Sequence, residues 1–136
     1  MRIFTIVFMI SMLMLISCGK IEQNEFTDLI QRNLNAMNSE DLEAAMATIH
    51  EDSPLYANTE TVTAQLFKTY DLQHTLKGCK VISRTPEEVI VEVMQVSKKI
   101  SGPQYQNTAG TLRHTLKRSN GVWKIYNSEL KDFRRI

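Results

Sequence analysis

The sequence predicts an α+β fold, in which N-terminal helices pack on a strongly curved antiparallel β-sheet. Apolar residues recur at helical spacing before Asp71, whereas alternating apolar residues and β-branched clusters dominate after it. Helices followed by a run of hairpin-connected strands are typical of an antiparallel α+β domain. The predicted strands are long, so we expect the sheet to curl strongly rather than lie flat.

Three amphipathic helices are predicted before Asp71. The pair Asn38-Ser39 interrupts the helical pattern and can cap a second helix, whose positive start is favoured by Glu40, Asp41 and Glu43. Pro54 stops this second helix, and Asn58 or Thr59 opens a third. The apolar positions at helical spacing are Phe26, Leu29, Ile30, Leu34 and Met37 in the first helix, Leu42, Ala45, Met46 and Ile49 in the second, and Val62, Leu66 and Tyr70 in the third.

Four strands are predicted in the second half of the chain. Asn120-Gly121 is a strong signal for a two-residue hairpin with a type I′ turn. The sequence Ser-Gly-Pro-Gln at 101–104 predicts a longer turn. The predicted strands cover 72–83, the β-branched run 89–94, 105–118 and 122–130.

The first 17 residues are predicted to form a secretory signal peptide. Arg2 provides a positive start and the only charge, and the run from Ile3 to Ile16 is almost entirely apolar. This run is short for a membrane span, which needs roughly 20 residues. Leu15-Ile16-Ser17-Cys18 resembles the lipobox of bacterial lipoproteins. An ordinary signal peptide with an incidental cysteine and an N-terminal membrane helix are the alternatives.

The lipobox resemblance implies cleavage after Ser17 and a diacylglyceryl group on Cys18. The chain then divides into a cleaved signal peptide at 1–17, a lipid anchor and tether at 18–21, and one domain at 22–136. Two or more acyl chains anchor a protein stably, so we expect attachment to the cell membrane or outer membrane on the exported side. The sequence contains two cysteines, so lipidation of Cys18 leaves Cys79 without a partner for an intrachain disulfide. Cys79 is then a small apolar residue in a strand.

Charge and motifs argue against several functional classes. Without the signal peptide, the 15 acidic residues are matched by 15 basic ones, so the sequence predicts no nucleic-acid binding. No glycine-rich phosphate loop or Gly-x-Ser-x-Gly nucleophile motif is present. The three histidines lack the spacing of a metal site, so no metal or cofactor is predicted. The run His50-Glu51-Asp52 is interpreted as a solvated polar helix end rather than a metal site.

The segment LIQRNLNAMNSEDLEAAMATIHEDS (29–53) and the closing NGVWKI (120–125) resemble parts of the nuclear transport factor 2-like superfamily, which includes SnoaL-like and steroid-isomerase branches. The first segment is similar to that family's pair of N-terminal helices. The second is similar to its last hairpin, with Trp123 entering the core. The resemblance covers about Glu22 to Phe133. It implies a cone-shaped domain with a pocket at its open end, used for catalysis, ligands or partners in different members.

Two positions depart from the steroid-isomerase branch. The resemblance implies a tyrosine on the first helix for binding an oxyanion, and this sequence has Asn33 there. It also implies a catalytic carboxylate after the second helix, where the stretch 54–58 contains no acid. Proton abstraction next to a carbonyl needs a base within hydrogen-bond reach. The isomerase chemistry is therefore not expected.

Five residues are candidates for lining the pocket: Asn33, Tyr56, His74, His114 and Trp123. The two histidines share the inward parity of their strands and could face each other as a base or ligand anchor. Two separate, hydrogen-bonded histidines at the core edge are the simpler alternative. Asn33 could instead satisfy a backbone group, and the two aromatic residues could simply be core.

The sequence favours a membrane-anchored envelope lipoprotein with a non-catalytic domain. Its partners would be the membrane, through the lipid anchor, and either a small apolar ligand or an envelope protein. The alternative is a small-molecule enzyme of isomerase, dehydratase or hydrolase type that uses the cone pocket. A homodimer through the sheet face is a further possibility, because members of the resembling superfamily often pair in this way.

Overall fold

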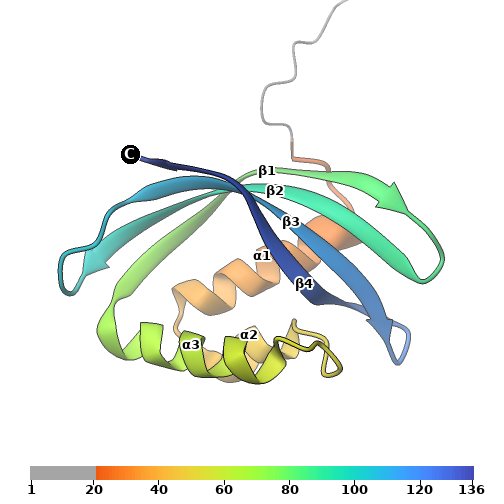
Figure 1. Cartoon of the computed structure of the whole chain (residues 1–136), viewed down its shortest axis with the longest axis horizontal. Coiled ribbons are helices and arrows are strands. Elements are labelled where there is room, and N and C mark those ends of the chain that lie inside the picture. The colour runs from red at the N-terminus through yellow and green to blue at the C-terminus, as the bar shows by residue number, and fades with distance from the viewer. Residues whose placement is uncertain (1–20) are drawn as a thin grey trace, which may run out of the picture.

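The computed structural model describes residues 21–136 (Figure 1). The predicted signal peptide and Cys18 lie outside these residues. Three helices precede four strands, as the sequence predicts. The elements are α1 (Glu25–Asn38), α2 (Leu42–Ala47), α3 (Tyr56–Thr69), β1 (Asp71–Arg84), β2 (Glu88–Ser101), β3 (Thr108–Ser119) and β4 (Val122–Arg135). No helix in the described part of the chain has the length and apolar content needed to cross a bilayer.

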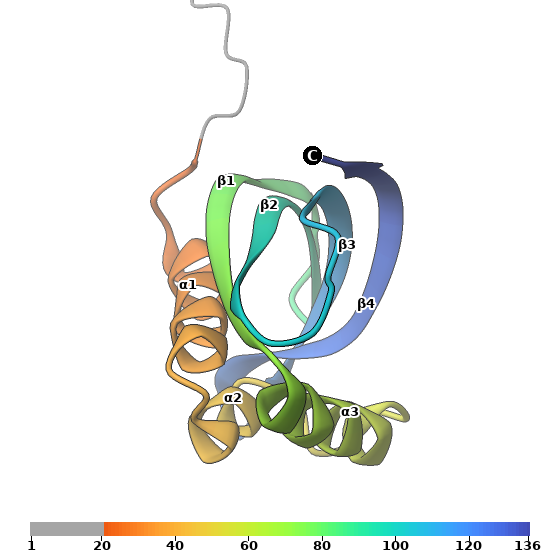
Figure 2. The same ribbon diagram turned by 90° about the vertical axis from the view of Figure 1, so that its left-hand side faces the viewer.

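The strands form one antiparallel sheet in the order β1-β2-β3-β4. The sheet arches over the helices, which lie on one of its faces (Figures 1 and 2). The predicted strong curl is wrong: the sheet is an open layer with β1 and β4 as its two edges. The strand register shifts three times between β1 and β2 and twice between β3 and β4. Such bulges bend a strand and increase its twist at single positions, so the bending is confined to these positions and the sheet arches without closing into a cone.

The hydrophobic core lies between α1 and the inner face of the sheet. One face of α1 meets alternate residues of all four strands, and Val89, Val91, Val93 and Leu116 are fully buried. Trp123 enters this core as predicted, with its ring packed edge-on against Phe26 at 5.6 Å between ring centroids. The core members are Phe26, Leu29, Ile30, Leu34, Leu76, Cys79, Val89, Val91, Val93, Leu116, Trp123 and Ile125.

Cys79 is a buried strand residue with a free thiol, in agreement with the sequence. Burial is the main cause that raises the pKa of this thiol. The thiolate is the reactive form of cysteine, so burial keeps Cys79 in its inert form. It contributes apolar surface to the core.

The second helix is shorter than its apolar pattern predicts. Its N-cap is Asp41, whose carboxylate accepts the backbone N–H of Ala44, rather than Asn38-Ser39. The helix stops before Ile49 because the following backbone pairs with β4. The N–H of Ile125 donates to the carbonyl of Thr48, and the N–H of His50 donates to the carbonyl of Ile125.

Other boundaries also differ from those predicted. Helix α3 begins at Tyr56 and buries only Thr63. Strand β2 runs through Ser101, and Tyr105 precedes β3 rather than opening it. Strand β4 extends to Arg135, five residues beyond the predicted end. The type I′ turn is confirmed by positive φ at both Asn120 (49°) and Gly121 (78°).

Candidate ligand-binding site

The two inward histidines lie in separate cross-strand pairs. His74 on β1 stands opposite Ser97 on β2, and its Nδ1 is 2.7 Å from the Ser97 hydroxyl. His114 on β3 stands opposite Ser128 on β4, also with 2.7 Å between Nδ1 and the hydroxyl. Strand β2 lies between β1 and β3, so each ring has a serine rather than the other histidine as its neighbour.

Burial determines the protonation of both rings. Desolvation lowers the pKa of His74, and it lowers the pKa of His114 from 6.5 to about 4. No carboxylate bonds to either ring in the described part of the chain, so nothing there stabilises an imidazolium. A general base works best when its pKa is near the operating pH. His114 is a weak base at neutral pH and serves better as a neutral hydrogen-bonding group.

The backbone of His74 is held by the end of α1. Its N–H donates to Oδ1 of Asn38 at 2.7 Å, and its carbonyl accepts from Nδ2 of Asn38 at 2.9 Å. One side chain thereby pairs both backbone groups of this residue on the edge strand β1. This contact fixes the position of the His74 ring relative to α1.

Asn33 and Trp123 have contacts of their own. Nδ2 of Asn33 donates to Oγ1 of Thr48 at 2.8 Å, which ties α1 to the end of α2. The indole of Trp123 is 6% exposed, and the guanidinium of Arg118 lies 4.4 Å from its ring centroid. Its Nε1 is buried and has no hydrogen-bond partner within residues 21–136. Both side chains therefore connect elements of the domain.

His50 is buried, and the prediction of a solvated helix end is wrong. Its Nδ1 accepts the backbone N–H of Asp52 at 3.1 Å, and its Nε2 is 3.0 Å from the carbonyl of Arg118. A carbonyl only accepts, so Nε2 carries the proton. The ring also packs edge-on against Tyr126. The backbone pairing of the segment after α2 with β4 places this histidine inside the domain.

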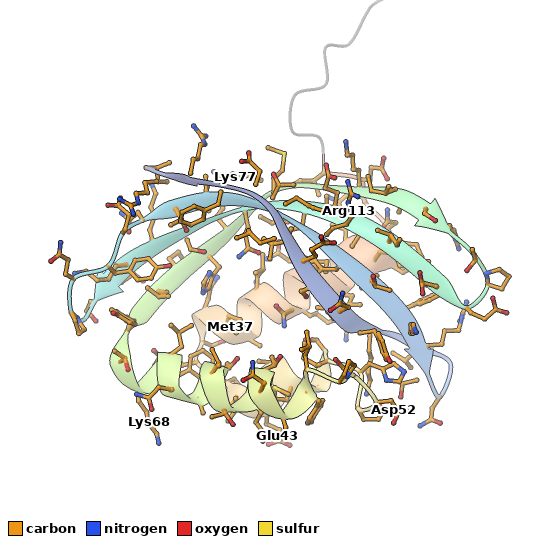
Figure 3. The ribbon with its side chains drawn as sticks, viewed as in Figure 1. Met37, Glu43, Asp52, Lys68, Lys77 and Arg113 are labelled. Carbon is orange, nitrogen blue, oxygen red and sulfur yellow. The ribbon has the colours of Figure 1, made fainter. Side chains whose placement is uncertain are left out.

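A cleft of about 570 Å³ lies between α2, the start of α3 and β4. Its floor is apolar and its rim is charged. Tyr56 is the sequence-predicted pocket residue that lines it. Glu43, which also lines the cleft, lies on the helix side of the domain, away from Lys77 and Arg113 on the outer face of the sheet (Figure 3). The lining residues are Leu42, Glu43, Met46, Ala47, Ile49, Glu51, Tyr56, Glu60 and Lys124.

The rim of this cleft has an excess of negative charge. Lys124 Nζ lies 3.6 Å from the carboxylate of Glu51. The hydroxyl of Ser119 also donates to Glu51, and this hydrogen bond is the first cause that lowers the pKa of Glu51. Glu43 and Glu60 form no ion pair within the described residues. The cleft therefore offers two unpaired carboxylates beside apolar surface, which suits a ligand with a cationic group.

Sequence reasoning missed the acidic residues of this cleft. Glu43 was expected only to favour the start of the second helix, and Glu51 to belong to a solvated helix end. The available signal was the four-residue spacing of Tyr56 and Glu60, which places them on one helix face. Within residues 21–136, no group of three or more histidine, cysteine, aspartate or glutamate side chains is placed to hold a metal ion.

Solved structures share this fold at low sequence identity. A protein of Novosphingobium aromaticivorans, proposed to be an aromatic ring hydroxylase, has a TM-score of 0.70 and 14% identity over 82% of this chain and 91% of its own. An NTF-2-like protein of unknown function from Shewanella oneidensis has a TM-score of 0.63 and 15% identity over 79% and 97%. An uncharacterised cystatin-like protein of Caulobacter vibrioides has a TM-score of 0.65 and 15% identity over 79% and 88%. The domain therefore has the nuclear transport factor 2-like fold that the sequence resemblance implies.

Sequence comparison identifies the family. The anti-sigma-I factor RsgI9 of Acetivibrio thermocellus is 28% identical over 108 residues, which is 79% of this chain but 15% of that protein. The chain thus corresponds to a small part of this regulator. The model of the RsgI9 C-terminal domain matches residues 28–136, which include all of β1–β4 and most of the helical layer. The chain therefore belongs to the family of the C-terminal domain of anti-sigma-I factor RsgI9.

Proposed function

We propose that the mature chain is a lipid-anchored binding domain that works on the exported side of a bacterial membrane and recognises its ligand without transforming it. The family relationship supports this, because the related domain forms part of a regulator, an anti-sigma factor. The chain covers only 15% of that regulator. We therefore assign to it a sensing or binding role and not the activity of the whole relative.

The anchor is proposed from the sequence. A positive start, an apolar run and the lipobox-like Leu15-Ile16-Ser17-Cys18 support export, cleavage after Ser17 and lipidation of Cys18. The tether at 18–21 is short, because an extended residue spans at most about 3.6 Å. The domain at 22–136 would then bind its ligand close to the bilayer surface.

The observation that favours a binding role over a catalytic role is the environment of the two interior histidines, His74 and His114. Each ring uses Nδ1 on a serine hydroxyl, and burial lowers the pKa of both, to about 4 for His114. An acid–base catalyst needs a group that exchanges protons near the working pH. Neutral, hydrogen-bonded rings favour a role in positioning a polar group.

The cleft between α2, α3 and β4 is our proposed recognition site. Glu43 and Glu60 at its rim favour a ligand with a positive charge, and Met46 and Ile49 at its floor favour an apolar body. Tyr56 combines an apolar ring with a polar tip. An amine or a basic side chain attached to an apolar group fits this chemistry. The other four predicted pocket residues, Asn33, His74, His114 and Trp123, are held by contacts within the domain and remain predictions as ligand contacts.

Native mass spectrometry of the full chain purified from its host's envelope tests the proposed site. We expect a defined extra mass on the wild-type chain, with lower occupancy in Glu60→Gln and Tyr56→Ala. Lys68→Ala on the same helix is the matched control and should keep the occupancy. Equal occupancy in all variants would refute the cleft as the site. An incubated ligand that is released chemically altered would refute the non-catalytic role.

Membrane fractionation tests the anchor. We expect wild-type chain in the membrane fraction, with a mature N-terminus at Cys18 whose peptide mass includes the acyl chains. Cys18→Ser should remain unprocessed and lack this mass, whereas Cys79→Ser should behave as wild type. An unmodified Cys18 in the mature chain would refute the lipid anchor.

A further inference from the structure

The two edges of the sheet are covered differently. Strand β1 is covered by Asn38 at His74 and by Glu22, whose N–H donates to the carbonyl of Cys79 at 3.1 Å. The first part of β4 is covered by residues 48–53, which bond to Ile125 and Tyr126. Strand β4 is the other edge strand and forms an outer margin of the sheet (Figure 2). An uncovered edge is a template for another strand.

The outward-facing backbone groups of β4 follow from its register. Ile125 faces outward, because both its N–H and its carbonyl bond to the segment after α2. Facing direction alternates along an antiparallel strand, and the two register shifts against β3 skip one residue each. The residues with outward N–H and carbonyl groups are therefore Ser128, Leu130, Phe133 and Arg135.

An independent contact supports this assignment. The N–H of Phe133 donates to the carboxylate of its neighbour Asp132 at 2.8 Å, and not to a carbonyl of β3. The N–H of Ile136 donates inward to the carbonyl of Asn107, as alternation from an outward Arg135 requires. The free edge thus carries a series of outward backbone groups that do not bond to another strand, and the Phe133 N–H would exchange its bond to Asp132 for one to a second strand.

The segment from Ser128 to Arg135, SELKDFRR, is self-complementary when it is paired with an antiparallel copy of itself. Placing Leu130 opposite Phe133 of the second copy also places Ser128 opposite Arg135. All four are outward-facing, so each opposed pair can exchange two backbone hydrogen bonds. The bulge at Lys131 brings Leu130 and Phe133 to the same face of the sheet. These side chains are 59% and 52% exposed.

The charges agree with the same register. Glu129 falls opposite Arg134 of the second copy, on the other face of the sheet. At the centre, Lys131 falls opposite Asp132 of the second copy. Every charged residue of the segment between 129 and 134 therefore meets the opposite charge. Cross-strand pairs of opposite charge stabilise a sheet, whereas like charges destabilise it.

We propose that the chain forms a two-fold symmetric dimer in which the segments 128–135 of two β4 strands pair antiparallel, with Leu130 of each copy opposite Phe133 of the other. The occupant of the free edge is thus a second copy of this chain. The two sheets become one continuous sheet, with both helical layers on the same side. This arrangement differs from the sheet-face pairing that the superfamily resemblance implies. A shared membrane raises the effective concentration of two anchored copies.

Charge reversal of the full chain tests the proposal. Glu129→Arg and Arg134→Glu each create two like-charge contacts in the symmetric dimer, so we expect each to weaken dimerisation roughly tenfold or more. A mixture of the two variants restores every opposite-charge contact and should form a mixed dimer. Sedimentation velocity of the detergent-extracted chain measures the species. Lys98→Glu on β2 is the matched control for Arg134→Glu and should dimerise like wild type.

Cysteine crosslinking in the membrane tests the register. Hydrogen-bonded strand partners lie about 5.5 Å apart at Cα, which suits a disulfide. Co-expressed Leu130→Cys and Phe133→Cys chains should form a mixed crosslinked dimer, and each variant alone should not. The wild-type chain controls for crosslinks through Cys18 or Cys79. A monomer at every concentration, no rescue by the charge-reversed mixture, or efficient crosslinking of Leu130→Cys chains with one another would overturn the proposal.

Discussion

The pKa of His114 predicts a stability change between neutral and mildly acidic pH. Burial lowers this pKa from 6.5 to about 4, so the unfolded chain binds more protons than the folded chain between these values. The free energy of unfolding therefore falls as the pH falls through this window. A difference of about 2.5 pKa units corresponds to about 3.4 kcal/mol over the whole window. About 2 kcal/mol of this is lost by pH 5.

Urea unfolding of residues 19–136, followed by fluorescence of the single tryptophan, measures this loss. Trp123 is buried, so its emission reports unfolding. We compare wild type and His114→Gln at about pH 7.5 and pH 5. The wild type should lose about 2 kcal/mol more than the variant, which has no proton to bind at this position. His74 remains in both proteins and cancels in the comparison. Equal losses would refute the role of His114 burial.

Three further substitutions test the packing and local geometry by the same unfolding measurement. Leu116→Ala removes a fully buried side chain and should cost about 2–5 kcal/mol; the exposed control Val122→Ala should change stability by no more than about 0.5 kcal/mol. Asn24→Ala removes the side chain that accepts two N–H groups at the start of α1 and should cost about 1 kcal/mol; an unchanged midpoint would mean that water replaces this cap. Gly121→Ala should cost roughly 1–2 kcal/mol through its positive φ alone, because no atom lies within 4 Å of the added methyl. A substantially larger cost would point to a steric clash.

The helices and strands were predictable where their pattern is local. Phe26, Leu29 and Ile30 repeat at helical spacing and lie on the buried face of α1. Asn120 and Gly121 form the expected turn because both adopt positive φ readily. The end of α2 was not predictable in the same way. Ile49 continues the helical pattern, but the backbone around it pairs with Ile125, far along the chain.

The candidate site illustrates the same limit. Parity correctly indicates that His74 and His114 point inward. Their serine partners depend on the register between strands, which the sequence does not specify, and the intervening strand β2 separates the two rings. The cleft depends on how α2, α3 and β4 meet. Glutamates there look like ordinary solvated residues until the fold brings them together around apolar surface.

The loose packing of α3 divides the domain into parts of unequal local stability. This helix buries only Thr63 and has no side-chain cap at its start, whereas α1 is inserted into the core. Segments with few buried contacts open at a lower free energy than the whole domain. The amide hydrogens of α3 should thus exchange with solvent long before those of α1 and β2. Tyr56 and Glu60 lie on this helix, so a ligand that contacts them would slow its exchange, and α3 would report occupancy of the cleft while the sheet stays unchanged.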